Sequence, residues 1–267
     1  MLNVRHALLV LMSLSFSGQG MAMGVATGFS AEAIQKAPMR KDYRAMMYVS
    51  KDAVRTESFI NNVPVVEIMN SGKNFRVLLV AKDKIYMQQI KSVRTGNKGL
   101  EKSEVMNPCE GLMNTSCRKI ATETVNNRET EKWQFTVTRN GQDYNSLHWI
   151  DVQYQMPIRE FLHNGTVMEL TMSGAETLHG RKTEKWSMLI THADGQTISV
   201  IQWYDLELKI MTREEMPGGF VRELVNIKTG KQDKDLFEIP AGYTQVEKLP
   251  DYLNMSSGYG QANPIQH

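Results

Sequence analysis

Turn signals at short intervals are the feature that most restricts how this chain can fold. Asn140-Gly141, Asn164-Gly165 and Asp194-Gly195 are dipeptides that commonly close a β-hairpin. Between residues 43 and 246 such signals recur about every 8–12 residues, without helical stretches of about 10–15 residues between them. This spacing predicts an antiparallel meander and argues against parallel βαβ units.

The segments between the turns have the alternation that is typical of strands. Residues 133–138 alternate apolar and polar side chains, and we also expect strands at 147–152, 74–80 and 84–87. Helix signals are few. Residues 30–37 predict one short helix, with Ser30 as N-cap and Pro38 as terminator. We therefore expect a mainly β protein with few short helices.

An internal repeat organises the second half of the chain. Arg128-Glu129-Thr130-Glu131-Lys132-Trp133 returns as Arg181-Lys182-Thr183-Glu184-Lys185-Trp186, and Trp149-Ile150-Asp151 returns as Trp203-Tyr204-Asp205. The offset is about 54 residues, so the copies span 128–174 and 181–230, each with about four strands. Two copies are too few for a propeller, so the repeat predicts one continuous curved sheet that grew by duplication.

The repeated aromatic residues are the candidate site. Trp133, Phe135 and Val137 share one face of a predicted strand, as do Trp186, Met188 and Ile190. Trp149 and Trp203 lie on the strands that follow. We expect these eight residues to form one apolar concave surface that receives a hydrophobic ligand. A filled core is the alternative, because a Trp on a strand usually packs against other side chains.

The N-terminus predicts export. Residues 1–22 have the form of a signal peptide, with Arg5 before an apolar run and Gly20-Met21-Ala22 as the cleavage site. The mature chain then begins at Met23. An uncleaved anchor is the alternative, although the apolar run of about ten residues is shorter than the roughly 20 that a spanning helix needs. A periplasmic location follows, and it is oxidising, so Cys109 and Cys117 are expected to form a structural disulfide.

Composition and the absence of known motifs argue against several classes of function. Lys and Arg number 31 against 29 Asp and Glu, so there is no basic excess to bind nucleic acid. The histidines show no metal-ligand spacing, and no nucleophile or phosphate-binding motif is present. We therefore expect neither an enzyme, nor a metal site, nor a cofactor.

Three motifs together resemble a known family. They are Tyr48–Glu57, Trp149-Ile150-Asp151 with Pro157-Ile158-Arg159, and Asp235–Tyr243. This set is similar to periplasmic proteins of the LolA/LolB/RseB type and to outer-membrane lipoprotein-sorting-like domains. The resemblance covers roughly residues 40–247 and implies a strongly curved antiparallel half-barrel, so we expect one domain over 23–247. Residues 248–267 are expected to form a flexible tail, because termini with small polar residues rarely order.

Two functions follow as hypotheses. In the first, which the resemblance favours, the protein binds a lipid, a lipoprotein or another hydrophobic ligand as a carrier or envelope sensor. In the second, it is an interaction module of an envelope assembly with a filled core and a protein partner. A cavity of about 300–1,000 Å³ would favour the first. Long unpaired sheet edges would favour the second.

Overall fold

A computed structural model describes residues 27–70, 73, 75–89, 107–109, 112 and 115–253. The predicted signal peptide and the start at Met23 lie outside the described residues.

The described chain forms one sheet of sixteen strands. In chain order the strands are β1 (Phe29–Lys36), β2 (Tyr43–Val49), β3 (Ala53–Ile60), β4 (Val63–Asn70), β5 (Phe75–Val80), β6 (Ile85–Gln89), β7 (Thr115–Val125), β8 (Arg128–Arg139), β9 (Gln142–Asp151), β10 (Pro157–Phe161), β11 (Val167–Leu178), β12 (Arg181–Thr191), β13 (Thr197–Asp205), β14 (Ile210–Met216), β15 (Phe220–Thr229) and β16 (Thr244–Gln245). Three short 3₁₀ turns complete the secondary structure: η1 (Pro217–Gly219), η2 (Lys234–Phe237) and η3 (Asp251–Leu253).

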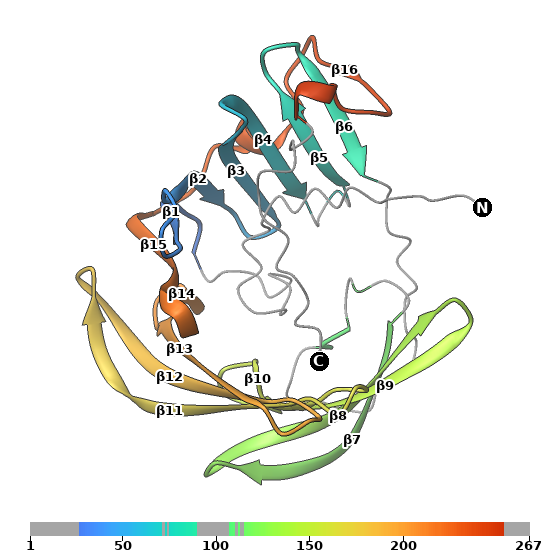
Figure 1. The fold of residues 1–267 in the computed structure, drawn as a ribbon, viewed down its shortest axis with the longest axis vertical. Helices are drawn as coiled ribbons and strands as arrows, with labels where there is room; N and C mark the ends of the chain where they lie inside the picture. The colour runs from blue at the N-terminus through green and yellow to red at the C-terminus, as the bar shows by residue number, and fades with distance from the viewer. Residues whose placement is uncertain are drawn as a thin grey trace.

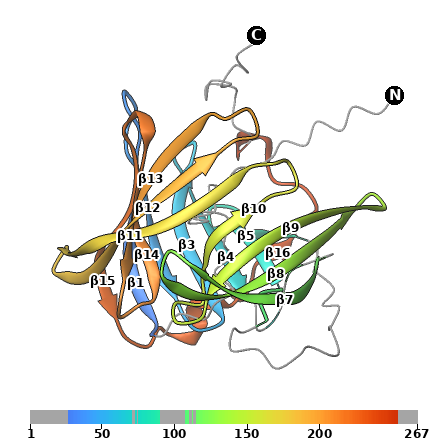
Figure 2. The ribbon, with the colours of Figure 1, turned by 90° about the horizontal axis from the view of Figure 1, so that it is seen from below.

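The sheet is strongly curved and unclosed, as the sequence predicted. Its strand order is β16-β6-β5-β4-β3-β2-β1-β15-β14-β13-β12-β11-β10-β9-β8-β7, and every pairing is antiparallel except that of β16 with β6. The strands β2–β6 face the strands β7–β13 across the opening, with β1, β14 and β15 between them (Figure 1). The β8–β9 and β11–β12 hairpins extend to opposite sides of the molecule (Figures 1 and 2).

The helix predicted over residues 30–37 is wrong, because this segment is strand β1. It pairs with β2 on one side and with β15 on the other. Phe29, Ala31 and Ala33 are buried at every second position, which is the period of a strand. Tertiary pairing on both edges therefore overrides the helix propensity of the alanines.

The repeat is present in the structure as two four-strand units. The first unit contains β8–β11 and the second β12–β15. Each unit has the same turn after its second strand, where Asp151 and Asp205 accept hydrogen bonds from the backbone N–H groups two and three residues later. Arg128 and Arg181, at equivalent positions, form ion pairs with these two aspartates.

The start of the expected C-terminal tail is packed against the sheet. Leu249 and Leu253 are buried in a cluster with Ile60, Leu78 and Val80. Residues 248–253 thus differ from the expected flexible segment, because two apolar side chains cover one face of β3–β5. Residues 254–267 lie outside the described part of the chain.

Candidate functional site

The turn lengths decide which Trp residues share a face. The two-residue turn Asn140-Gly141 pairs Trp133 with His148 and Lys132 with Trp149. Cross-strand partners lie on the same face and adjacent residues on opposite faces, so Trp133 and Trp149 point to opposite sides of the sheet. The longer turn after Thr191 pairs Trp186 with Gln202 and leaves Trp203 on the opposite side.

The expectation of one surface for all eight residues is therefore corrected. Trp133, Phe135, Val137, Trp186, Met188 and Ile190 lie on one face, which we call the Trp133 face. Trp149 and Trp203 lie on the other face. The physical reason is the length of each turn. The turn decides which residue of the second strand lies opposite Trp133 or Trp186, and the next Trp is one residue away from that position.

Burial divides the six residues of the Trp133 face into two groups. Trp133, Trp186 and Met188 are buried, whereas Phe135, Val137 and Ile190 are only half-buried. Trp133 packs with Ile150 and the Cys109–Cys117 pair. Trp186 belongs to a separate cluster that also contains Met188, Trp149, Val200 and Tyr204. The two repeated Trp side chains are thus core residues, and the accessible apolar positions lie farther along their strands.

A single cross-strand row connects these strands. Followed through the register, the row is Trp133, His148, Glu160, Met168, Ile190 and Ile198. Its far end is open, because Ile198 is 38% exposed. The row is apolar at both ends and polar in the middle.

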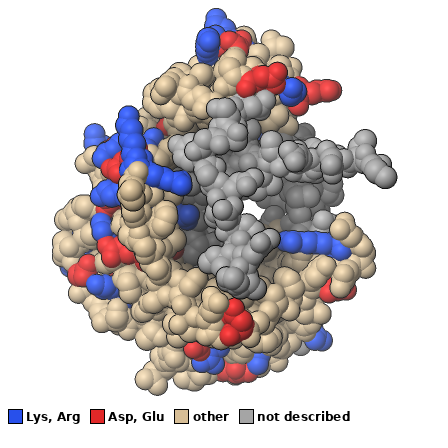
Figure 3. Space-filling model, viewed as in Figure 1, with Lys and Arg blue, Asp and Glu red and all other residues tan. Residues whose placement is uncertain are grey.

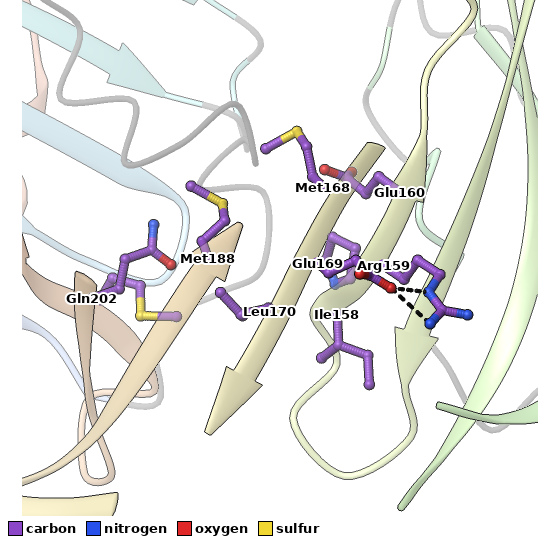
Figure 4. A pocket seen from close by; sticks show the side chains of 10 residues that line it. Ile158, Arg159, Glu160, Met168, Glu169, Leu170, Met188 and Gln202 are labelled. Carbon is purple, nitrogen blue, oxygen red and sulfur yellow. Dashed lines mark hydrogen bonds and ion pairs between the residues drawn. The ribbon is translucent and has the colours of Figure 1, made fainter. Parts of the chain in front are cut away.

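A small pocket lies beside the middle of this row. It is lined by Pro157, Ile158, Arg159, Glu160, Met168, Glu169, Leu170, Met188, Gln202 and Met211 (Figure 4). Its volume is about 20 Å³, which is room for about one water-sized group and far too little for an acyl chain. Three methionines line it, and their unbranched side chains adapt easily to a ligand.

The two polar residues of the row, His148 and Glu160, form a hydrogen-bonded chain with Ser146 on the same strand as His148, and sequence reasoning missed it. Ser146 Oγ lies 2.8 Å from His148 Nε2, and His148 Nδ1 lies 2.7 Å from Glu160 Oε1. The Phe135 ring contacts the imidazole at a centroid distance of 4.0 Å. His148 and Glu160 are twelve residues apart on different strands, so only the register of β9 with β10 could have revealed the pair.

The opposite face carries a duplicated arrangement around Trp149 and Trp203. The Trp149 Nε1–H donates to Glu123, and the ring lies between Lys132 and Arg159. This hydrogen bond, together with Lys132, holds the pKa of Glu123 below its usual value.

The second copy repeats these contacts. Trp203 donates to Glu176, and its ring lies between Lys185 and Arg213. Both Trp rings are buried beneath cations, at 8% and 4% exposure, so this face presents charge and not apolar surface. Basic and acidic side chains are interspersed over the described surface in the view of Figure 3.

The predicted disulfide between Cys109 and Cys117 is present, with the two Cα atoms 5.9 Å apart. Among the described residues, no group of three or more His, Cys, Asp or Glu side chains is arranged to hold a metal ion. In the same part of the chain no helix has the length and apolar character needed to cross a membrane.

No family model and no curated protein matches the chain. Among solved structures it is similar to a LolA superfamily protein from Nitrosomonas europaea, at 11% sequence identity and a TM-score of 0.38, over 81% of this chain and 90% of that one. A DUF1329 family protein from Desulfovibrio piger gives 11% identity and a TM-score of 0.38, over 79% of this chain and 90% of that one. A putative outer membrane lipoprotein-sorting protein domain from Vibrio parahaemolyticus gives 11% identity and a TM-score of 0.35, over 79% of this chain and 89% of that one.

Proteins of the type that the sequence motifs resemble are therefore among the structures to which this chain is similar. At these identities and TM-scores, the similarity carries no argument about ligand, partner or activity.

Proposed function

We propose that this chain is a non-catalytic binding protein of the periplasm that receives a lipid, the acyl chain of a lipoprotein or another hydrophobic ligand. The observation that carries the proposal is the accessible apolar part of the Trp133 face. Phe135 and Val137 are half-buried on β8, Ile190 is half-buried on β12, and Ile198 on β13 is 38% exposed. An apolar face that is left accessible gains free energy when it is covered, about 0.8 kcal/mol for each CH₂ group that a ligand buries.

The methionines beside this surface support the same proposal. Met168 and Met188 line the pocket next to Ile158 and Leu170, and they project from neighbouring strands (Figure 4). The pocket itself does not hold a chain, so the ligand's apolar part lies along the row from Met168 to Ile198. A carrier or sensor needs reversible binding, and a shallow surface of adaptable side chains suits it.

Titration with a fluorescent fatty alcohol, an amphiphile without charge, tests this function, with a matched pair of variants. Ile198→Lys places a charge on the Trp133 face, and Leu189→Lys places one on the opposite face of the neighbouring strand. Both residues are similarly exposed, at 38% and 43%, so neither substitution disturbs the core. We expect saturable binding by the wild type, a loss of about tenfold or more in Ile198→Lys, and little change in Leu189→Lys. Absence of saturable binding, or equal effects of the two variants, contradicts the proposal.

A second candidate function is that of an interaction module with a protein partner. It is favoured by β7, which ends the strand order with eleven residues and carries Ile120 at 41% exposure. A strand edge of this length can pair with an extended segment of another protein. If the fatty alcohol does not bind while Ile120→Lys abolishes association with an envelope protein, the second function replaces the first.

A further inference from the structure

The polar chain Ser146–His148–Glu160 interrupts an otherwise apolar row. Side chains of His148 and Glu160 are only 13% and 15% exposed, so both are largely removed from water. With Glu160 ionised, its oxygen can only accept a hydrogen bond, so His148 Nδ1 donates to it. When the imidazole is neutral, His148 Nε2 is then the acceptor for the Ser146 hydroxyl. The remaining lone pairs of Ser146 and Glu160 can therefore accept hydrogen bonds from a neighbouring group.

The internal repeat shows that this chemistry is particular to the first copy. At the offset of 54 residues, Ser146 corresponds to Val200, His148 to Gln202 and Glu160 to Glu214. Gln202 donates to Glu214 at 2.8 Å, so the cross-strand link to the carboxylate is kept. The link is therefore part of the repeated fold, and the second copy supplies a natural replacement for His148.

The charges that line the pocket leave a negative excess. Arg159 bonds Glu169 through two nitrogens, and this pair is neutral as a whole (Figure 4). Glu160 has His148 as its partner, and the imidazole balances the charge of Glu160 only when both ring nitrogens carry a proton. Lys119, the next cation beyond Trp133 along the row, forms an ion pair with Glu131. A cationic group is thus favoured beside Glu160, and an anionic group is repelled.

We propose that this pocket receives the head group of the ligand, and that the head group is a positively charged hydrogen-bond donor, a primary ammonium. The inference rests on the proposed function and adds the class of ligand. An ammonium group has the size of a water molecule, which the pocket of about 20 Å³ accommodates. It donates to Glu160, while the attached chain runs over Met168 towards Ile190 and Ile198. A fatty carboxylate in the same position meets Glu160 with a like charge.

Three amphiphiles with one chain length test the inference: dodecylamine, dodecanol and dodecanoate, each titrated below its micelle concentration by calorimetry. We expect dodecylamine to bind at least about tenfold more tightly than dodecanoate, with dodecanol between them, and the difference to shrink as salt is raised. In Glu160→Gln the difference between amine and carboxylate should disappear. In His148→Gln, which copies the second repeat and keeps Glu160 charged, it should persist.

The outcomes distinguish a failure of this inference from a failure of the proposed function. If none of the three compounds binds to the wild type, the proposed function and the inference both fail. If all three bind equally, or dodecanoate binds best, the apolar surface stands and the ammonium site is refuted. The wild-type comparison decides this even if a variant folds poorly. A preference for the amine that survives in folded Glu160→Gln also refutes it, since the attraction then arises elsewhere.

Discussion

Asp151 and Asp205 are single residues on which whole turns depend. Each is 1% exposed, accepts two backbone hydrogen bonds and pairs with an arginine. A buried carboxylate is stable only when such partners satisfy it. Removal of either aspartate side chain leaves two backbone N–H groups without an acceptor and a largely buried arginine guanidinium without its counter-charge.

Asp151→Ala should therefore lower the free energy of unfolding by about 3 kcal/mol, since breaking a buried ion pair costs about 3–5 kcal/mol and Arg128 is partly accessible. Urea unfolding followed by Trp fluorescence measures it. Asp143→Ala is the control, because Asp143 lies on the same strand but is exposed, and its loss should cost under about 1 kcal/mol. Equal effects of the two substitutions would show that the turn does not depend on Asp151.

Two tyrosines, Tyr154 and Tyr204, should make the stability of the folded state depend on pH in the alkaline range. Burial, aided for Tyr154 by a hydrogen bond to Glu184, raises the pKa of Tyr154 and of Tyr204 to about 12. Their rings contact each other at 5.4 Å. In the unfolded chain a tyrosine loses its proton near pH 10, so the folded state holds protons that the unfolded state has released.

The contribution of these tyrosines to the free energy of unfolding is fully present below about pH 10, and it is lost as the pH rises from about 10 to 12. We expect urea midpoints to fall across this window, with the tyrosinate absorbance of Tyr154 and Tyr204 appearing late. Tyr204→Phe should flatten the fall, and Tyr144→Phe should leave it unchanged. A wild-type midpoint that stays constant up to pH 12 would exclude this linkage.

At the scale of elements, the hairpins could be predicted from sequence and their faces only in part. Asn140 and Gly141 have φ of 51° and 76°, the left-handed conformation that Asn-Gly adopts readily, so the β8–β9 turn follows from the dipeptide. The same two-residue turn fixes that Trp133 and Trp149 point to opposite sides. This consequence was available in the sequence, once the turn length was taken as two residues.

Other elements depend on contacts that no local pattern contains. Residues 29–36 have helix-forming alanines, and they form a strand because β2 and β15 supply both edges. The His148–Glu160 pair requires the β9–β10 register, which includes an irregularity between Pro157 and Arg159. A bulge shifts every later pairing, so the sequence alone could not place Glu160 opposite His148.

The disulfide connects a short segment to the edge strand β7 and to the Trp133 cluster. Cys109 and Cys117 are buried, and they pack with Trp133, Phe135 and Ile150. The double variant Cys109→Ala/Cys117→Ala should lose about 2–3 kcal/mol of stability, the chain-entropy value for so short a loop, and keep ligand binding. Urea unfolding with and without reductant measures it, because reduction should affect the wild type and not the variant. No difference between the two proteins, or loss of binding in the folded variant, would contradict a purely structural role.

At the scale of the whole molecule, β1 is the strand that joins the two halves of the sheet. In the strand order it lies between β2, which leads into β3–β6, and β15, which ends the repeated half. Its register pairs Ala33 with Ala45 and with Leu224, although Leu224 lies nearly 200 residues later in the chain. Such distant pairing forms late and slowly in folding, because a long loop must close first.

Disruption of β1 should therefore uncouple the halves. Ala33 is 2% exposed, so Ala33→Asp buries a charge without a partner, and it should cost at least about 3 kcal/mol. We expect hydrogen exchange to rise most in β1, β2 and β15. The β8–β9, β11–β12 and β12–β13 pairs, whose registers are long, should keep more of their protection. Ser30→Asp is the control, because Ser30 is half-buried on the opposite face of the same strand and a charge there stays near water. If Ala33→Asp instead raises exchange uniformly in every strand, the sixteen strands unfold as one cooperative unit, and β1 is not the boundary between two parts.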